Sequence, residues 1–340
     1  MTFGLVSFGE ALGEPALVAD VVAEHTDDVS RVIDLGYRRV HRAPPQVGIT
    51  DLAALAGRDA LAAADVRPAD VDLVVLAVTD IVEHLYWDAS AELAHRLGAT
   101  RAETVLLTQA CTTGVVCLDA VAGKLATHPD YRTALVVAAN RTCEAYWNRM
   151  DVQPMVFSDG AVAAVARRDH PRLRWLATEV TTDGRYADFY RLDVGGAANP
   201  FQARPGAVDE PPRVRDVWSV MEHFDFDAEQ FAEFGRYLDE QAVRTAELAC
   251  RRAGTKPSEL ARLILLNDNA RAMAATAAAF GVPLSRTNHE LAVELGHLGA
   301  ADQLLCLNRH LAAGELAPGD QVALISMGRG MHWACTLIEA

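Results

Sequence analysis

The sequence lacks several features that would place it in other classes of protein. Its six cysteines are scattered, with no CxxC pair and no Cys/His spacing typical of a metal site. It also lacks an excess of basic residues: the formal net charge of -15 at pH 7 argues against nucleic acid as a partner. No apolar run approaches the roughly 20 residues that span a bilayer. The N-terminal residues include no basic stretch of the signal-peptide kind. We therefore expect a cytoplasmic protein with reduced thiols, no bound metal and no membrane partner.

The sequence does have a high apolar content and an internal repeat. Hydrophobic residues make up 51% of the 340 positions, enough for a large core and about two domain-sized units. The segment that starts at Ala60 resembles the segment that starts at Ala249, and Pro68 then corresponds to Pro257, an offset of 189 residues. The same offset pairs further residues over about 80 positions: Cys117 with Cys306, Leu118 with Leu307, Ala134 with Ala323 and Leu135 with Leu324. We infer an ancient duplication.

Each copy has the pattern of alternating helices and strands. Helices of small apolar residues are expected at 51–64 and 241–253, and continuous apolar strands at 71–78 and 263–266. A second helix, a short strand, a third helix and a closing strand follow in each copy, the last two at 114–127 and 133–139, and at 302–313 and 321–327. Continuous apolar strands indicate sheets covered on both faces. Two such halves predict an α/β protein with the duplicated, five-layered αβαβα architecture of the thiolase fold.

The repeat also predicts the domain organisation. Residues 1–182 form the first half and residues 228–340 the second. Between them, residues 183–227 are rich in glycine, proline and charge and show weak periodicity, which is typical of a connector or lid.

Cys111 is the candidate nucleophile because it lies where a buried strand, 104–108, passes into a helix that begins near Thr113. A helix N-terminus offers free N–H donors and a partial positive charge, which favour the thiolate over the thiol. The same donors can bind the oxyanion that forms when a thioester carbonyl is attacked. Gly114 allows substrate to approach the backbone closely.

Three motifs in this order resemble the β-ketoacyl-acyl-carrier-protein synthase III family over nearly the whole chain. They are the Gln-Ala-Cys-Thr-Thr-Gly segment around Cys111, the run Met-Val-Phe-Ser-Asp-Gly-Ala at 155–161, and Gly-Arg-Gly-Met-His-Trp at 328–333. The resemblance implies a homodimer without a permanently bound cofactor, which takes acyl groups from an acyl carrier protein or from CoA. It also implies an oxyanion hole formed by the backbone amides of Cys111 and Arg329. Trp87 falls where the partner subunit's contribution to the pocket is expected, and His332 would line the pocket.

The sequence departs from the condensing members of this family, which use Cys, His and Asn. Their His opens a His-Gln-Ala-Asn run, and the corresponding position here is Leu266 or Asn267. Their Asn position holds His297, and five residues later comes Asp302. The repeat places 297–302 as the counterpart of the Cys111 loop, so the two loops are expected to face each other. We therefore predict a Cys111–His297–Asp302 triad.

Several residues stay as alternatives or additions to this triad. His289 is the competing histidine, although its polar neighbours indicate a surface position. Asn267 and Asn269 are candidates for orienting the substrate.

A Cys-His-Asp set suits acyl transfer, because His takes a proton from one nucleophile and later from another. The pattern is similar to a subgroup of synthase-III-like acyltransferases of actinomycete antibiotic and polyketide pathways. We therefore expect transfer of an acyl group to a hydroxyl, or less readily an amine, of a small-molecule acceptor such as a sugar or an aminocyclitol. Two alternatives stay open: a starter-unit shuttle between thiols, and a decarboxylative synthase that forms a carbon–carbon bond. A catalytically retired partner subunit is a third, against which the intact Cys111 argues.

Overall fold

The computed structural model describes residues 2–151, 154–200 and 216–340. In this part of the chain the main sheet has nine strands in the order β5-β4-β6-β7-β1-β8-β11-β10-β9. The strands are β1 (Phe3–Leu12), β4 (Leu73–Val78), β5 (Glu103–Leu107), β6 (Thr133–Asn140), β7 (Gly160–Arg168), β8 (Arg174–Thr182), β9 (Arg262–Ile264), β10 (Gln321–Gly328) and β11 (His332–Glu339). A separate small sheet pairs β2 (Glu14–Leu17) with β3 (Arg39–Arg42).

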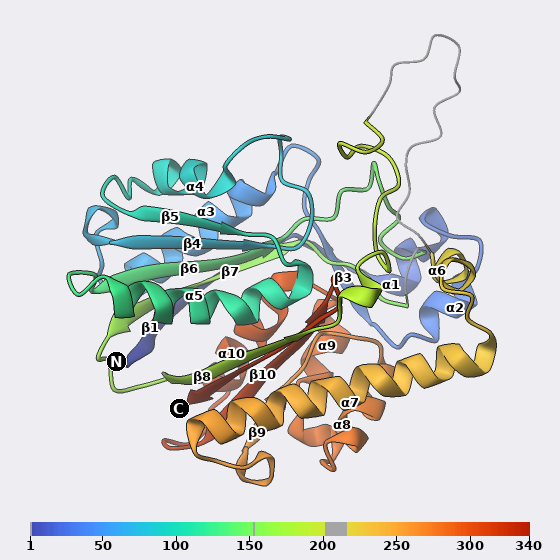
Figure 1. Ribbon diagram of the computed structural model, residues 1–340. Helices are drawn as coiled ribbons and strands as arrows, with labels where there is room; N and C mark the ends of the chain where they lie inside the picture. Colours follow the sequence, from blue (N-terminus) through green and yellow to red (C-terminus); the bar gives the residue numbers. More distant parts are fainter. Residues whose placement is uncertain (1, 152–153, 201–215) are drawn as a thin grey trace.

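Helices cover both faces of each half of the main sheet (Figure 1). The described helices are α1 (Val18–Val21), α2 (Val29–Ile33), α3 (Ile49–Ala63), α4 (Ala89–Leu97), α5 (Thr113–Thr127), α6 (Val217–His223), α7 (Ala228–Ala253), α8 (Ala270–Ala279), α9 (His289–Leu295) and α10 (Asp302–Ala312). The predicted five layers are present: α3 and α4 lie outside the first half-sheet, α5 and α10 lie between the half-sheets, and α7 and α8 lie outside the second.

The burial of the strands follows from this layering. Every residue of β4 and of β6 is buried, as expected of strands with helices on both faces. Between the halves, one core cluster joins α5 and α10 to residues of both half-sheets. The stretch Ala110–Thr127 is the one described helix that is long and apolar enough for a membrane span, and 56% of it is buried. Its position in the middle layer is that of a core helix.

The internal repeat is visible in the elements. The 3₁₀ turns Pro68–Asp70 and Pro257–Glu259 keep the offset of 189, and so do the 3₁₀ turns Ala110–Thr112 and Gly299–Ala301. Helix α5 corresponds to α10, and β6 corresponds to β10. The strand order of the first half, β5-β4-β6-β7-β1, is repeated as β9-β10-β11-β8 without a counterpart of β5.

Two expectations differ from the structure. The second half begins at β8, that is at Arg174, rather than after residue 182, because β8 pairs with β11 along its length and takes the place that β1 has in the first half. The short strand expected in both copies exists as β5 only; in the second half the corresponding residues lie in and just after α9. Within the predicted connector, α6 and a short turn at Gly184–Tyr186 are described, and residues 201–215 lie outside the described residues.

Candidate active site

Cys111 is presented by a sharp corner between β5 and α5. The chain leaves β5 at Leu107 and enters α5 at Thr113 through the 3₁₀ turn that contains Cys111. Ala110, directly before the cysteine, has φ of 53°, in the left-handed region that a residue with a Cβ rarely adopts. The corner is held from the second half, because the Ser326 hydroxyl donates to the carbonyl oxygen of Cys111 at 2.8 Å.

His297 and Asp302 complete the predicted triad geometry. The Sγ atom of Cys111 lies 3.2 Å from His297 Nε2, and His297 Nδ1 lies 2.6 Å from Asp302 Oδ2. The carboxylate is fixed by two backbone donors: the Leu298 amide donates to Oδ1 at 2.7 Å and the Asn267 amide to Oδ2 at 2.9 Å. The carboxylate therefore orients the imidazole so that Nε2 points at the thiol.

Burial and charge set the protonation of this triad. His297 is 1% exposed and Asp302 is completely buried. Burial alone lowers the pKa of His297, but the facing Asp302 and Cys111 outweigh burial and raise this pKa well above its usual value. An imidazolium 3.2 Å from the Sγ atom of Cys111 can pair with a thiolate, the form of cysteine that attacks a carbonyl carbon.

The triad is assembled from the two copies of the repeat, whose loops lie against each other. A Cβ placed on Gly114 would lie 1.7 Å from the carbonyl oxygen of Ala300, so only glycine allows this approach. Thr79, at the end of β4, accepts a hydrogen bond from the Ala300 amide at 2.6 Å. The His297 loop is therefore held against the first half at two points, Gly114 and Thr79.

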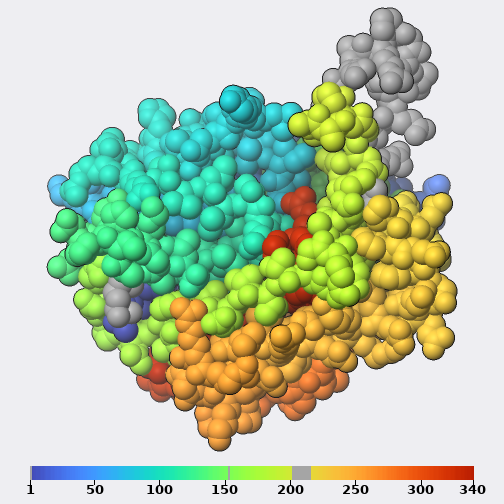
Figure 2. Space-filling model, viewed as in Figure 1, coloured from blue at the N-terminus to red at the C-terminus, as the bar shows by residue number. Residues whose placement is uncertain are grey.

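The thiol opens into a cavity of about 290 Å³. Its lining is mostly apolar and includes four aromatic side chains. The lining residues are Thr79, Asp80, Ile81, Ala110, Cys111, Tyr146, Trp147, Met155, Phe157, Tyr190, Arg191, Leu192, Leu266, His297, Met327, Gly328, Arg329 and Met331. Figure 2 shows the yellow-green residues of β8 and of the segment after it between the teal surface of the first half and the orange surface of α7.

Tyr146, Trp147 and Phe157 form an aromatic wall of the cavity. None of the three was predicted from the sequence as a site residue. Trp147 is held by its indole N–H, which donates to Asp80 Oδ2 at 2.8 Å, and its ring meets that of Phe157 edge-on with centroids 4.3 Å apart. Burial raises the pKa of Asp80 although three donors contact its carboxylate. The adjacent aromatic residues Tyr146 and Trp147, shortly before the motif at 155–161, were the sequence feature that could have indicated this wall.

The Gly-rich loop lies beside Cys111, as the resemblance implies. A Cβ on Gly328 would lie 3.2 Å from the Cys111 amide nitrogen, and Arg329 lines the cavity. The Arg329 side chain turns away to donate to the carbonyl oxygen of Thr79.

Four other candidates do not line the cavity. Asn267 is fully buried behind the triad, where its side chain donates to the Gly296 carbonyl oxygen at 2.9 Å. Asn269 caps α8, with its side chain accepting from the Ala272 amide. His332 faces Thr182, at 2.9 Å between Nδ1 and Oγ1. Trp87 packs on the outer face of the first half-sheet.

Of the two residues predicted at the position of the family's histidine, Leu266 and Asn267, only Leu266 faces the cavity. Leu266 lines the cavity, whereas Asn267, one residue further, points into the opposite side. The competing histidine, His289, begins α9 and lines neither this cavity nor the one described next.

A smaller cavity of about 60 Å³ shares Leu266 and Met327 with the main one. Asp239 and Asp268 both line it. Burial raises the pKa of Asp268 to about 6. In the described part of the chain, no group of three or more His, Cys, Asp or Glu side chains is placed to hold a metal ion.

Comparison with known proteins gives consistent matches. A family model for 3-oxoacyl-[acyl-carrier-protein (ACP)] synthase III matches residues 107–184, and one for the C-terminal part of this enzyme matches residues 250–340. The β-ketoacyl-[acyl-carrier-protein] synthase III of Gloeobacter violaceus is 31% identical over 303 residues, covering 89% of this chain and 87% of the relative.

Two solved structures show the same fold. ChlB3, described as an acyltransferase, has a TM-score of 0.86 at 22% identity, covering 100% of this chain and 98% of the other. The 3-oxoacyl-(acyl carrier protein) synthase III of Pseudomonas aeruginosa has a TM-score of 0.79 at 24% identity, with the same coverage. At these identities the two structures establish the thiolase-type fold alone. The reaction has to be inferred from the residues of the site.

Proposed function

Since the chain belongs to the β-ketoacyl-acyl-carrier-protein synthase III family, we propose that it is an acyltransferase that forms esters, or less readily amides. The observation that carries the proposal is the hydrogen-bonded series Cys111–His297–Asp302. The acyl group would come from a carrier-protein or CoA thioester and pass through Cys111 to a hydroxyl or amine of a specialised metabolite, such as a sugar or aminocyclitol in antibiotic or polyketide biosynthesis.

The first half-reaction loads the cysteine. The Cys111 thiolate attacks the thioester carbonyl carbon, and the resulting oxyanion accepts hydrogen bonds from the Cys111 and Arg329 backbone amides. When the carbon–sulfur bond of the donor breaks, the imidazolium of His297 gives its proton to the departing thiolate. The acyl group is then bound to Cys111, and His297 is neutral.

The second half-reaction reuses His297 as a base. The neutral imidazole takes the proton of an acceptor hydroxyl as the oxygen attacks the acyl-enzyme, and Cys111 leaves as the thiolate beside a newly formed imidazolium. Asp302 keeps Nδ1 protonated throughout, so Nε2 is always the nitrogen that exchanges protons. No carbon nucleophile and no loss of carbon dioxide is needed.

The lining of the cavity supports acyl transfer over condensation. A developing enolate needs polar donors, and the residue that lines the cavity at the family's histidine position is Leu266, which has none. The alternatives remain a thiol-to-thiol starter shuttle and a decarboxylative synthase. The names of the relatives favour the second, because the matched relative from Gloeobacter violaceus is named as a synthase.

Intact-protein mass spectrometry after incubation with a panel of acyl thioesters tests the proposal. We expect a mass gain of one acyl group, absent from Cys111→Ala, and loss of the gain when a sugar or aminocyclitol acceptor is added. With a malonyl thioester, an intact malonyl ester on the acceptor supports acyl transfer. Release of carbon dioxide with a new carbon–carbon bond would overturn it in favour of the synthase.

A carrier protein is acidic, and this chain is acidic overall, so docking requires a local basic face. The arginines of the β3 region are already engaged within the chain: Arg38 and Arg39 pair with Glu294, and Arg42 pairs with Glu144. These ion pairs lower the net charge that this face offers to a carrier.

A further inference from the structure

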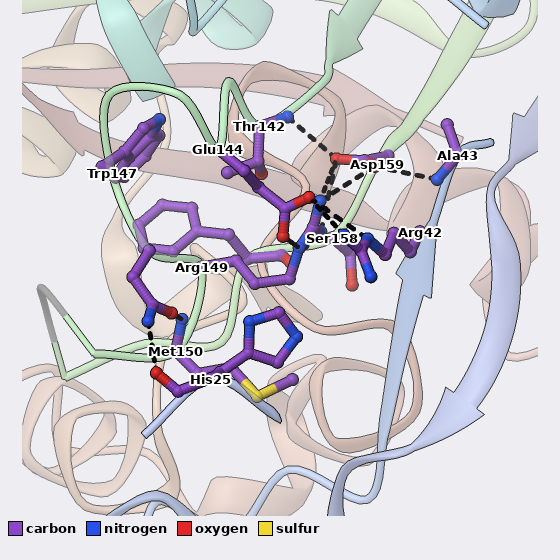
Figure 3. Close-up of polar contacts among 12 residues, drawn as sticks. His25, Arg42, Ala43, Thr142, Glu144, Trp147, Arg149, Met150, Ser158 and Asp159 are labelled. Carbon is purple, nitrogen blue, oxygen red and sulfur yellow. Dashed lines mark hydrogen bonds and ion pairs between the residues drawn. The ribbon is translucent and has the colours of Figure 1, made fainter. Parts of the chain in front are cut away.

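Four charged side chains form a cluster around the buried pair of Arg149 and Asp159, and Glu144 and Arg42 complete it (Figure 3). Arg149 is 1% exposed and Asp159 is completely buried, and the Arg149 Nη2 atom lies 3.2 Å from Asp159 Oδ2. The Nε atom of Arg149 donates to Glu144 Oε1 at 2.8 Å, and Arg42 donates to the other oxygen of Glu144 at 2.8 Å. Two guanidinium groups therefore alternate with two carboxylates, and neither buried charge is left unpaired.

The cluster connects separate segments of the first half. The Asp159 carboxylate accepts from the Thr142 amide through Oδ1 and from the Ala43 amide through Oδ2, each at 2.8 Å. Thr142 precedes the segment that carries the aromatic wall, Ala43 follows β3, and Asp159 precedes β7. These contacts fix both ends of the segment from Thr142 to Asp159.

Arg149 also reaches the backbone next to the triad. Its Nη1 donates to the Phe157 carbonyl oxygen at 2.8 Å, and its own carbonyl oxygen accepts from the Phe157 amide at 3.0 Å. Arg149 thus holds Phe157 through its side chain and its main chain at once.

Phe157 and its neighbours hold His297. Phe157 and His297 form a parallel β-bridge, in which the His297 amide donates to the Val156 carbonyl oxygen and the Ser158 amide donates to the His297 carbonyl oxygen, each at 2.8 Å. The Phe157 ring also packs edge-on against the imidazole, with centroids 5.1 Å apart. The catalytic histidine of the second half is thus aligned by a backbone segment of the first.

We propose that Arg149, paired with Asp159 and Glu144, is a positioning residue that sets the alignment of His297 toward Cys111 through the Phe157 backbone. An apolar side chain of similar volume would fill the same space, and buried ion pairs are not by themselves a source of stability. The guanidinium supplies what an apolar side chain lacks: a planar fork that meets two carboxylates and a carbonyl oxygen in fixed directions. The role rests on the proposed function, because it presupposes that His297 activates Cys111.

The test measures the reactivity of Cys111 without any acyl donor. Wild type and Arg149→Lys are alkylated with iodoacetamide between pH 5.5 and 10, and the modification rate is followed by intact-protein mass spectrometry. Lysine keeps the positive charge and loses the fork. We expect Arg149→Lys to react about tenfold more slowly than wild type at pH 6–7 and equally fast near pH 10, where the thiol ionises unaided. Arg67→Lys, in the exposed pair with Asp70, is the matched control and keeps the wild-type profile.

Glu144→Gln provides a milder variant if Arg149→Lys fails to fold, because Glu144 is 29% exposed and glutamine keeps its shape. A twofold to threefold loss at pH 6–7 is expected. A profile identical to wild type in a folded variant, even with a lower melting temperature, would show a structural role alone and overturn the proposal. A wild-type thiol that is no more reactive at pH 6–7 than that of His297→Gln would overturn the triad, and the positioning role with it.

Discussion

Asp302 is the residue on which the histidine tautomer depends, because its Oδ2 atom faces His297 Nδ1 at 2.6 Å. Replacement by asparagine keeps the size of the side chain. Asparagine offers one accepting oxygen where the carboxylate offers two, so it cannot accept from the Leu298 amide, the Asn267 amide and Nδ1–H together, and it carries no charge to stabilise the imidazolium.

We therefore expect Asp302→Asn to fold and to lose about 10³–10⁴-fold in the rate of acyl transfer. His297→Ala should lose a comparable factor, and the double variant little more, since the residues act as one unit. Single-turnover acylation followed by mass spectrometry measures each rate. Near-normal turnover of either single variant would remove that residue from the triad.

Asp268 predicts a dependence of stability on pH. Burial raises the pKa of this carboxyl from 3.8 to about 6 in the folded chain. The stability that the group contributes is therefore complete below pH 3.8 and is lost as the pH rises through about 6. The shift corresponds to a loss of about 2–3 kcal/mol in unfolding free energy between low pH and pH 8.

Asp268→Asn should consequently be more stable than wild type at pH 8, because asparagine can still accept from the Asn269 amide. The difference should shrink toward pH 4. Urea unfolding at pH 4, 6 and 8 measures it. A gain that is the same at every pH would show that charge is not its cause.

Cys111 could be singled out from the sequence as the candidate nucleophile, because it lies in a motif of small residues at a strand–helix junction. The pairing of His297 with Asp302 was predictable from position and spacing, and the structure places their side chains in contact. The sequence could not decide whether Leu266 or Asn267 faces the cavity. Successive side chains near the end of a strand point to opposite faces, so an alignment error of one residue reverses the answer. The hydrogen bonds between Arg149 and Phe157 form only in the folded chain, so no local sequence pattern indicates them.

Among the elements, α5 depends most closely on a glycine. Because a Cβ on Gly114 would overlap the Ala300 carbonyl oxygen, Gly114→Ala must push the two loops apart. We expect a loss of roughly 2–3 kcal/mol in unfolding free energy and a severe loss of acylation, because Cys111 and His297 lie on opposite sides of this contact.

Gly123→Ala is the matched control in the same helix. A Cβ at Gly123 meets no atom within 4 Å, and alanine is the better helix former. This variant should be about 0.5–1 kcal/mol more stable than wild type, with unchanged acylation. Urea unfolding and single-turnover acylation of both variants test the pair. Equal behaviour would show that the close contact is not required.

The helices and strands were largely predictable from the repeat and from apolar periodicity, as the matching 3₁₀ turns at Pro68 and Pro257 illustrate. The residue at which the second half begins could not be predicted in this way. Strand β8 precedes the region in which the repeat can be read, and only its pairing with β11 identifies it as the counterpart of β1. The second half also lacks a strand equivalent to β5 in the described residues, a loss that similarity between the copies could not reveal.

At the scale of the whole molecule, the family resemblance predicts a homodimer, and an exposed apolar segment offers a way to test it. In the loop after β4, Leu85 is 65% exposed and Tyr86 is fully exposed, next to Trp87. Apolar side chains gathered on a surface are typical of contact sites.

We expect wild type to sediment at twice the mass of one chain, and Leu85→Asp with Tyr86→Asp to shift it toward the monomer. If the partner completes the pocket, acyl transfer by this double variant should fall as the protein is diluted. Sedimentation velocity and activity over a range of concentrations measure both effects. Leu55→Asp, at another exposed apolar position, serves as the control. A double variant that stays dimeric would place the interface elsewhere.

The contact between Gly114 and the Ala300 carbonyl oxygen has a consequence for how this sequence can change over time. Elsewhere the two copies differ: the first has β5 and Cys111, whereas the described residues of the second have no strand equivalent to β5, and Ala300 takes the place of the cysteine. Where their loops touch, a larger residue in one copy is tolerated only if the backbone of the other retreats. Because the contact is with backbone atoms of residue 300, no change of that side chain makes room at position 114, so we expect glycine to be the residue that this position requires.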